Sequence, residues 1–393
     1  MSASRFAETF DAITVEQLRA TRASKWALPD GAIGAFVAEM DFGTTPAVIE
    51  ALHREADRGS FGYAAEPLVE DLRAATAERL ATAHDWHINP ADVHPVPDVI
   101  TVLEQAIATV TDPCTPVVVP TPAYMNFFNA VRNLGREVIE VPMRIDAEGL
   151  HRLDLVAIAD AIESSGAQLV ILCNPHNPTG RVMTREELEA FSRMIEAAGV
   201  RVFADEIWAP LTFGGRPHIP YASISPAAAS HTITAVAASK GWNIPGLKCA
   251  QAVLSNDQDR EIWGGMVPPI AHRTSTIGMA GTIAAYRDDS GWIEEVRDYL
   301  EVNTRIVHDA FAATVPAAHV GCPQGTYVSW IDLAELSIPG SPTEFIHQRA
   351  GVVPTDGTLC GEPGRTCIRF IAAMPRPILE QAVERMTAAL ASL

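Results

Sequence analysis

One lysine in this sequence lies where its amine could be both buried and reactive. Lys240 belongs to the run Ala237-Ala238-Ser239-Lys240-Gly241-Trp242, which follows an apolar, β-branched segment at 232–236. Burial disfavours the charged form of a lysine, so it lowers the pKa of the amine and prepares it to form a Schiff base. Lys248, further along the same loop, is a second cation that could meet a phosphate. The alternative is that both are surface lysines at a turn, because a lone lysine is a weak signal.

Two more polar groups follow apolar segments in the same way. The loop after 169–173 reads Asn174-Pro175-His176-Asn177-Pro178-Thr179-Gly180 and contains two Asn-Pro steps. There Asn177 presents an amide beyond the end of a predicted strand, although a plain turn uses the same residue types. Asp205 directly follows the apolar segment 200–204. A carboxylate in that position must be paired or protonated, and a pyridinium nitrogen is a suitable partner. Capping of the next helix is the alternative role for Asp205.

A single arginine interrupts an apolar run near the C-terminus, Thr366-Cys367-Ile368-Arg369-Phe370-Ile371. A buried arginine needs an anionic partner, and its planar guanidinium can bind a carboxylate through two parallel hydrogen bonds. The carboxylate of a substrate is one candidate for that partner. A structural salt bridge within the protein is the other.

Short apolar segments and amphipathic segments alternate along the chain and would position these groups. The candidate strands are Val93–Val96, Val117–Val119, Val138–Val141, Leu169–Cys173, Val200–Ala204, Thr232–Val236 and Gln251–Leu254. The candidate helices between and after them are Val99–Val110, Met125–Leu134, Glu186–Ala198, Trp292–Ala312 and a terminal helix from Pro377. Capping boxes at Thr184 with Glu187 and at Ser341 with Glu344 mark two helix starts. This alternation predicts a mostly parallel sheet with helices on both faces, and ligands bind beyond the carboxyl ends of such strands.

Composition limits the classes of partner. The chain has 393 residues and a formal net charge of -19, which argues against nucleic acid and anionic membranes as partners. Its cysteines are scattered without a C-x-x-C pair, the N-terminal residues lack the pattern of a signal peptide, and no apolar run could cross a bilayer. We therefore expect a cytoplasmic protein. No metal site is expected, and no G-x-G-x-x-G follows a strand, so a dinucleotide site has no support.

Together these segments resemble the fold-type I pyridoxal-5′-phosphate (PLP) enzymes of the aspartate aminotransferase superfamily. Within it the chain is most similar to the MalY/PatB-type cystathionine β-lyases, or C–S lyases. The motifs typical of that branch are Val37–Phe42, Phe61–Tyr63, Thr121–Tyr124, Cys173–Pro178 and Ser239–Lys248. The resemblance begins near Lys25 and implies an α/β fold. A large PLP-binding domain at 46–289 would contain a mostly parallel seven-stranded sheet, and 1–45 with 290–393 would form a smaller α+β domain.

The resemblance implies a role for each residue that would contact the cofactor ring or the substrate. Lys240 would carry PLP as a Schiff base and later move protons. Asp205 would pair with the pyridine nitrogen, and Asn177 would hydrogen-bond the phenolic oxygen. Tyr124 would stack on the ring, and Arg369 would hold the carboxylate of an amino acid substrate. Lys240, Arg369, Asp205 and Tyr124 would thus be the catalytic group.

The phosphate of the cofactor would be held by a second set of residues. Backbone amides at Val99 and Ile100, at the start of a helix, would favour an anion. Lys248 and Ser239 would add contacts. Tyr63 would reach the same phosphate from the neighbouring subunit, which implies a homodimer with shared active sites.

Five positions depart from the family pattern. Trp208 replaces a Tyr or His, and Ala237 stands where a phosphate-binding Ser is common. Asp98 replaces a Gly beside the phosphate, where it would be harmless as a helix cap but would repel the anion directly. Ile371 replaces an Asn that often follows the arginine, and the segment ending at Cys360 lacks an expected aromatic residue. The last two concern the substrate side of the site.

The resulting hypothesis is a PLP-dependent β-elimination that cleaves cystathionine, cysteine or a related cysteine S-conjugate to a thiol, pyruvate and ammonia. The nearest alternative is a class I/II aminotransferase, which needs the same lysine and the same cofactor chemistry up to the carbanion. A non-catalytic PLP-binding regulator is a third possibility. Its expected mark would be the loss of Lys240, Asp205 or Arg369, and all three are present.

Overall fold

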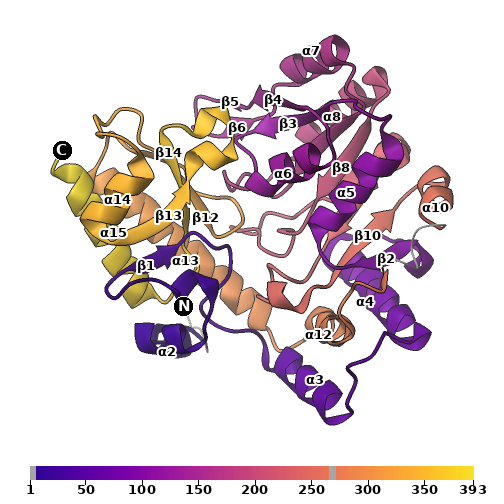
Figure 1. Ribbon diagram of the computed structural model, residues 1–393, viewed down its shortest axis with the longest axis horizontal. Helices are drawn as coiled ribbons and strands as arrows, with labels where there is room; N and C mark the ends of the chain where they lie inside the picture. Colours follow the sequence, from indigo (N-terminus) through magenta and orange to yellow (C-terminus); the bar gives the residue numbers. More distant parts are fainter. Residues whose placement is uncertain (1–5, 265–270) are drawn as a thin grey trace.

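The seven predicted strands form one sheet in the computed structural model, which describes residues 6–264 and 271–393 (Figure 1). The order across the sheet is β2 (Val93–Val96), β10 (Ala250–Leu254), β9 (Thr232–Val236), β8 (Arg201–Asp205), β7 (Leu169–Cys173), β3 (Val117–Thr121) and β4 (Val138–Pro142). The five strands from β9 to β4 are parallel, whereas β10 is antiparallel to both β9 and β2. The prediction of a mostly parallel seven-stranded sheet is confirmed.

Alternate residues of each central strand point to opposite faces of this sheet, and both faces are covered by helices. Val117 and Val119 of β3 pack into the core on one face, with helices α5 (Val99–Val110) and α6 (Met125–Asn133). Val118, between them, packs into the core on the other face. The helices of that second face are α7 (Leu155–Ser165), α8 (Arg185–Ala198) and α9 (Pro226–His231). The sheet is therefore buried on both sides, which explains why its strands are continuously apolar in sequence.

The predicted helix starts are largely as expected. Thr184 and Glu187 form the complete capping box of α8: Glu187 N donates to Thr184 Oγ1 and Thr184 N donates to Glu187 Oε2. At α14 (Pro342–Ala350) only half of the box is formed in the described chain, because Ser341 Oγ accepts from Glu344 N without a return bond from the Glu344 side chain. The prediction of a second full capping box is thus wrong, while the helix start is right.

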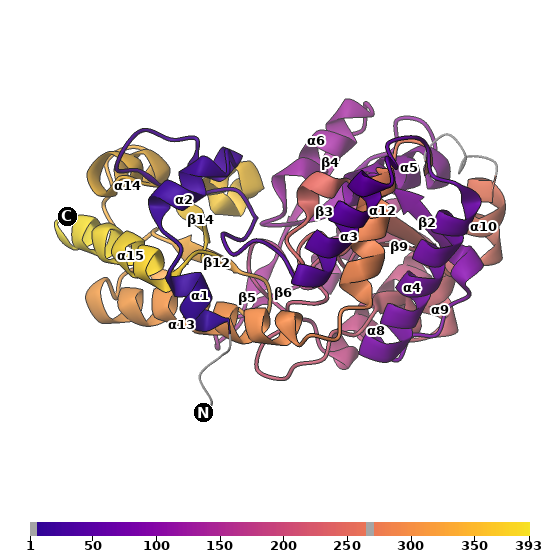
Figure 2. The same ribbon diagram turned by 90° about the horizontal axis from the view of Figure 1, so that it is seen from below.

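The C-terminal part of the chain contributes most of a second sheet. Its order is β1 (Ile33–Ala35), β13 (Val352–Asp356), β14 (Cys367–Ile371), β12 (Val328–Asp332) and β11 (His319–Val320). Helices α13 (Trp292–Thr314), α14 and α15 (Arg376–Ala391) pack on it around a separate hydrophobic core (Figure 1). Because β1 pairs in parallel with β13, the N-terminal segment lies with the C-terminal elements (Figure 2). The two sheets agree with the expected division of the chain, whose limits stay a prediction.

The remaining helices cover the edges of these two layers. Helix α12 (Thr276–Tyr286) packs against α3 (Pro46–Asp57) and α4 (Glu66–His84). The other short elements are α1 (Ala7–Asp11), α2 (Val15–Ala20), α10 (Asp257–Gly264) and the hairpin β5 (Arg144–Ile145) with β6 (His151–Arg152). Within the two described ranges, none of the helices has both the length and the apolar character that a membrane span requires.

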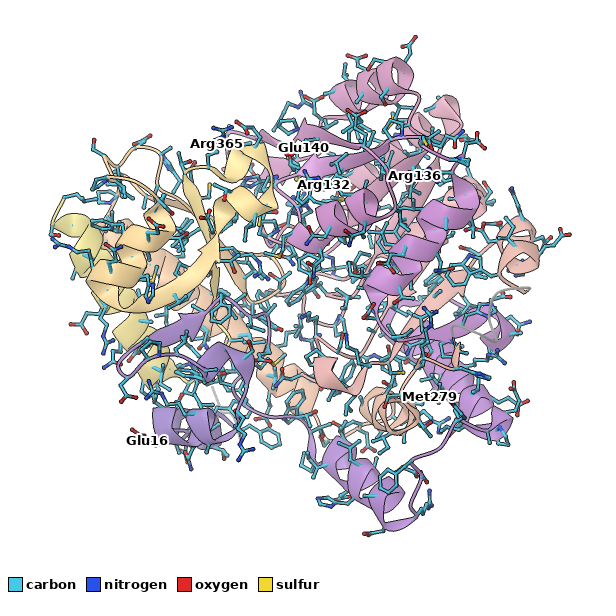
Figure 3. The ribbon with its side chains drawn as sticks, in the orientation of Figure 1. Glu16, Arg132, Arg136, Glu140, Met279 and Arg365 are labelled. Atoms are coloured by element: carbon cyan, nitrogen blue, oxygen red, sulfur yellow. The ribbon has the colours of Figure 1, made fainter. Side chains whose placement is uncertain are left out.

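Polar contacts join the two sheets where they face each other. Glu140 on β4 accepts a hydrogen bond at 2.9 Å from the backbone N–H of Glu362, close to Arg365 in the opposite layer (Figure 3). A deeper contact involves Lys25, whose amine donates to Asp41 Oδ2 at 2.9 Å and to the carbonyl of Ala373 at 3.2 Å. The other oxygen of Asp41 accepts from Trp26 Nε1 at 2.8 Å. This buried network fixes the segment at 36–42 that crosses towards the first sheet.

Candidate active site

A cavity of about 190 Å³ lies at the carboxyl ends of the parallel strands. Lys240, in the loop after β9, lines this cavity and donates from Nζ to the carbonyl oxygen of Ala38 at 2.7 Å. Burial, together with the nearby Arg369 guanidinium, lowers the pKa of Lys240 to about 8. An amine with that pKa is neutral in an appreciable fraction of molecules near neutral pH, so Lys240 is suited to attack an aldehyde.

Asp205 is the last residue of β8 and is almost fully buried beneath the same cavity. Within the described chain its carboxylate receives one hydrogen bond, from the backbone N–H of Ile207 to Oδ1 at 3.0 Å. Burial raises the pKa of Asp205 to about 7, against the opposing effects of that bond and of Lys240. The expected alternative, in which Asp205 merely caps a helix, does not account for a carboxyl group held this deep. A cation placed in the cavity would satisfy it.

Arg369 lies in β14 and contacts the cavity through Asn177. Arg369 Nε donates to Asn177 Oδ1 at 3.0 Å, and Nη1 donates to the carbonyl of Phe36 and to Thr355 Oγ1. Nη2 is buried and has no partner among the described residues. None of the ion pairs in 6–264 and 271–393 includes Arg369, so this part of the chain does not contain the alternative structural salt bridge. The guanidinium is left with a free donor for an anion.

The predicted phosphate-binding residues also converge on the cavity. Val99 and Ile100, in the first turn of α5, line it together with Ser239 and Lys248. Tyr63 does not, because its side chain is 84% exposed and its ring lies beside His272. Its expected contact with phosphate would have to be made to another subunit.

The departures from the family pattern have different consequences in the structure. Trp208 lines the cavity and is fully buried, with its ring 4.7 Å from the ring of Tyr327 and 5.6 Å from Lys240 Nζ. Ala237 lies outside the cavity, against α4. Ile371 and Cys360 are buried in hydrophobic clusters and do not line it. The predicted effect of the last two on the substrate side is therefore indirect.

Sequence reasoning missed three residues of the site. The carbonyl of Ala38 accepts from both Lys240 and the hydroxyl of Tyr327. Asn126, in the first turn of α6, lines the cavity and donates from Nδ2 to Tyr124 Oη at 2.7 Å. Ala38 lies within the Val37–Phe42 motif, which could have pointed to it. Neither Tyr327 nor Asn126 belongs to a motif with a known chemistry.

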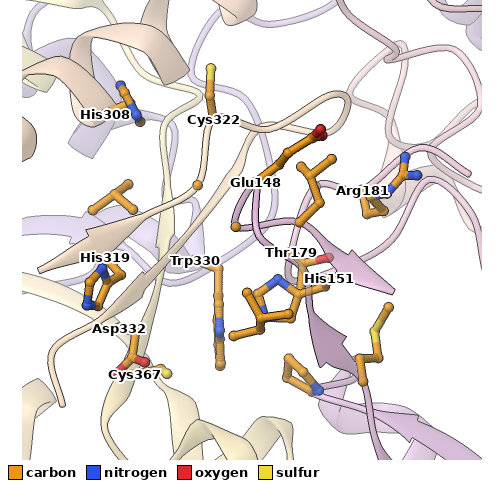
Figure 4. Close-up of a pocket in the computed structure, with 18 of the residues that line it drawn as sticks. Glu148, His151, Thr179, Arg181, His308, His319, Cys322, Trp330, Asp332 and Cys367 are labelled. Atoms are coloured by element: carbon orange, nitrogen blue, oxygen red, sulfur yellow. The ribbon is translucent and has the colours of Figure 1, made fainter. Parts of the chain in front are cut away.

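A larger cavity of about 870 Å³ lies elsewhere, between the two sheets (Figure 4). His151, His308, Trp330 and Asp332 are among its lining residues, and it touches the Asn177 loop only at Thr179 and the two residues after it. None of the predicted catalytic or cofactor-binding residues lines it. The volume of a cavity therefore does not identify the candidate active site. The smaller cavity is the candidate active site, because it contains the Lys240 amine and the Asp205 carboxyl group, whose pKa values are shifted by burial.

The residues of the smaller cavity fit PLP. The Lys240 amine suits the aldehyde, and the unpaired, buried Asp205 carboxyl suits the ring nitrogen. Asn177 has its carbonyl oxygen occupied by Arg369, which leaves its amide N–H group to donate to the phenolic oxygen. The N-terminus of α5 and the Lys248 amine suit a phosphate. The fold and this donor set together define an enzyme of the PLP-dependent fold-type I class.

Comparison with known proteins narrows this class. The family model described as aminotransferase class I and II matches residues 36–386, and the chain belongs to that family. It is 32% identical to a cystathionine beta-lyase of Corynebacterium glutamicum, over 96% of this chain and 99% of the relative. It is 26% identical to an aspartate aminotransferase of Geobacillus stearothermophilus, over 90% of both chains. The solved PLP-bound C-S lyase of Staphylococcus hominis superimposes with a TM-score of 0.88 at 25% identity, over 97% of this chain and 98% of that one.

Asp98 provides a test of how this site receives its phosphate. Asp98 Oδ1 caps α5 by accepting from Thr101 N, and Oδ2 pairs with Lys248 Nζ at 3.1 Å. The Asp98 carboxylate thus binds both groups that a phosphate would use, the N-terminus of α5 and the Lys248 amine. Asp98→Asn keeps a capping side chain but removes the charge, so we expect PLP to bind about three- to tenfold more tightly. Fluorescence titration of the apoenzyme with PLP measures this.

The matched control is Asp154→Asn, because Asp154 likewise caps a helix, α7, and likewise pairs with a basic side chain, that of Arg144. It does not line the cavity. The control should leave PLP affinity unchanged. Weaker or unchanged binding by Asp98→Asn would show that Asp98 does not compete with the phosphate.

Proposed function

We propose that this protein is a PLP-dependent carbon–sulfur β-lyase that cleaves cystathionine, cysteine or a related cysteine S-conjugate to a thiol, pyruvate and ammonia. The observation that carries the chemistry is one cavity with the low-pKa amine of Lys240 and, across Asn177, an Arg369 guanidinium that has no acidic partner among the described residues. The choice of elimination over transamination is supported by the greater identity to a cystathionine beta-lyase, 32%, than to an aspartate aminotransferase, 26%.

When bound, PLP supplies the electron sink for the pair of electrons left at Cα after deprotonation. Lys240 is the residue that removes the Cα proton, because its lowered pKa leaves part of the amine neutral near pH 7. Asp205 would pair with the ring nitrogen of PLP and favour its protonated form, because a buried carboxylate is stabilised by a cation beside it. Arg369 holds the substrate carboxylate, with Nη2 as the available donor.

The alternative remains a class I/II aminotransferase, which uses the same residues up to loss of the Cα proton. The two reactions differ in their products: elimination releases a thiol, pyruvate and ammonia, whereas transamination passes the amino group on to an oxo acid. Product analysis decides between them. Purified protein with PLP and L-cystathionine is expected to release pyruvate and ammonia in equal amounts without an oxo-acid acceptor. Glutamate formed only when 2-oxoglutarate is present, with no pyruvate from cystathionine, would instead identify an aminotransferase.

The proposal includes a homodimer in which Tyr63 of each subunit completes the phosphate site of the other. Tyr63 and Phe61 support it, because these two aromatic residues lie only two positions apart in sequence and expose 84% and 72% of their surface. Neighbouring exposed aromatic side chains are a typical mark of an interface. It also includes a reducing, cytoplasmic setting. The six cysteines support this, since all of them lie in the described chain as free thiols.

A further inference from the structure

Tyr124 and Asn126 form a polar pair at the wall of the cavity. Tyr124 is the N-cap residue of α6, and Asn126 lies in the first turn of that helix. Asn126 Nδ2 donates to Tyr124 Oη at 2.7 Å, and Asn126 Oδ1 accepts in turn from Asn129 Nδ2 at 3.2 Å. Because the amide oxygen is engaged by Asn129, the amide N–H group is the part that faces the phenol.

This contact determines which way the phenol hydrogen points. A phenol oxygen that receives a hydrogen bond must direct its own hydrogen elsewhere. No side chain or carbonyl in 6–264 or 271–393 accepts that hydrogen, although both Tyr124 and Asn126 line the cavity. The hydrogen is therefore available to a molecule bound there. We propose that Asn126 is a positioning residue that orients the Tyr124 phenol as a hydrogen-bond donor into the cavity.

The charges around Tyr124 are compatible with a donor role. Burial raises the pKa of Tyr124, while Arg369 on β14 and the Asn126 amide lower it, and Asp205 on β8 and Asp98 at α5 raise it. The sum of these effects is a raised pKa, so the phenol keeps its hydrogen at neutral pH. Asn126 has a distinct part in that balance, because a hydrogen bond to the oxygen favours the phenolate.

The consequence for catalysis rests on the proposed β-lyase function. When the bond between Cβ and sulfur breaks, its electron pair stays on sulfur, and the phenol hydrogen bonds to the developing thiolate. The hydrogen remains on Tyr124, because burial raises the pKa of this phenol above its usual value of about 10. The thiolate then takes its proton from water. Such a hydrogen bond helps a thiolate leave but has little to offer a leaving group such as chloride.

The first test measures the phenol directly. In holoenzyme labelled with ¹³C at the tyrosine ζ carbon, the Tyr124 resonance is identified by its loss in Tyr124→Phe and is titrated with pH. Asn126→Ala should raise the pKa of Tyr124 by about half a unit to one unit, since it removes one hydrogen bond from the phenolate. Asn126→Asp should raise it further, because its carboxylate accepts the phenol hydrogen and repels the phenolate. Asn133→Asp is the matched control, an exposed asparagine at the other end of α6.

The second test uses the leaving group. Asn126→Asp turns the phenol hydrogen away from the cavity, so kcat/KM for S-ethyl-L-cysteine should fall about tenfold, the equivalent of one good hydrogen bond. The value for β-chloro-L-alanine should change by less than about twofold. An unchanged Tyr124 pKa in both Asn126 variants, or equal losses with the two substrates, would overturn the proposal. A wild-type enzyme that releases no pyruvate from either substrate would refute the lyase function, and the titration would still judge the role of Asn126.

Discussion

Replacing Lys240 by alanine is expected to lower the rate of pyruvate release by at least about a thousandfold. Two functions are lost in this single change. In the proposed mechanism, the cofactor would lose the amine that binds it covalently, and the substrate would lose the base that removes its Cα proton. The loss exceeds that of an ordinary general base, because a weakly held cofactor is also oriented less well for the reaction. Steady-state assays at saturating PLP with L-cystathionine measure it.

The composition of the chain makes this prediction easy to test chemically. The sequence contains only three lysines, Lys25, Lys240 and Lys248. Reduction of the holoenzyme with borohydride should therefore fix PLP to one peptide, the one that contains Lys240. Lys25 is buried in an ion pair, and Lys248→Met should still be labelled at Lys240. Covalent label on Lys240→Ala, or turnover within tenfold of the wild type, would contradict the assigned role.

Much of this site can be predicted from sequence because its residues follow strands directly. Asn177 and Lys240 lie in the loops after β7 and β9, and Asp205 ends β8, between those two strands. Adjacent parallel strands bring their carboxyl ends to one edge of the sheet. A local pattern, in which an apolar strand is followed by a polar residue, is thus enough to predict that these three side chains lie close together. Arg369 can be predicted for a related reason, because it is the lone charged residue of a buried strand.

Other contacts could not be predicted, because they depend on how distant segments meet. The carbonyl of Ala38 lies 202 positions from Lys240 in sequence and yet accepts its hydrogen bond. The residue type does not reveal what a backbone carbonyl will bind, because every residue has one. Asn126 is an ordinary residue for a first helical turn, and only its place at the cavity gives it a role. Tyr327 does not line the cavity, and only its hydrogen bond to the carbonyl of Ala38 connects it to the site. The parallel pairing of β1 with β13 could not be predicted for the same reason, because the sequence of a strand does not indicate which other strand it pairs with.

The Lys25–Asp41 pair belongs to this second kind of contact, and its removal has the other large expected effect. Lys25→Met should lower the free energy of unfolding by about 3–5 kcal/mol, because it leaves the Asp41 charge buried without its partner. Chemical denaturation at one fixed protein concentration measures the change. The exposed pair Arg58–Glu55 is the comparison, and Arg58→Ala should cost less than about 1 kcal/mol.

The cost of Lys25→Met should also depend on pH in a definite direction. Burial raises the pKa of Asp41 above its value in an unfolded chain, about 3.9. Over the range between those two pKa values, the folded state holds a proton that the unfolded state has released, so the unfolding free energy falls as pH rises. Without Lys25 to oppose it, the upward shift of the Asp41 pKa grows. The Lys25→Met variant should therefore have a lower free energy of unfolding at about pH 8 than at about pH 5.

The double variant Lys25→Met/Asp41→Asn separates loss of charge balance from loss of packing. The asparagine can still accept from Trp26 Nε1 but carries no charge, so the double variant should regain at least half of the lost stability and lose the pH dependence. A double variant as unstable as Lys25→Met would mean that the lysine acts through its contact with the Ala373 carbonyl instead. In either case the segment that presents Ala38 to Lys240 is anchored here, so the stability of this pair and the geometry of the active site depend on the same buried contact.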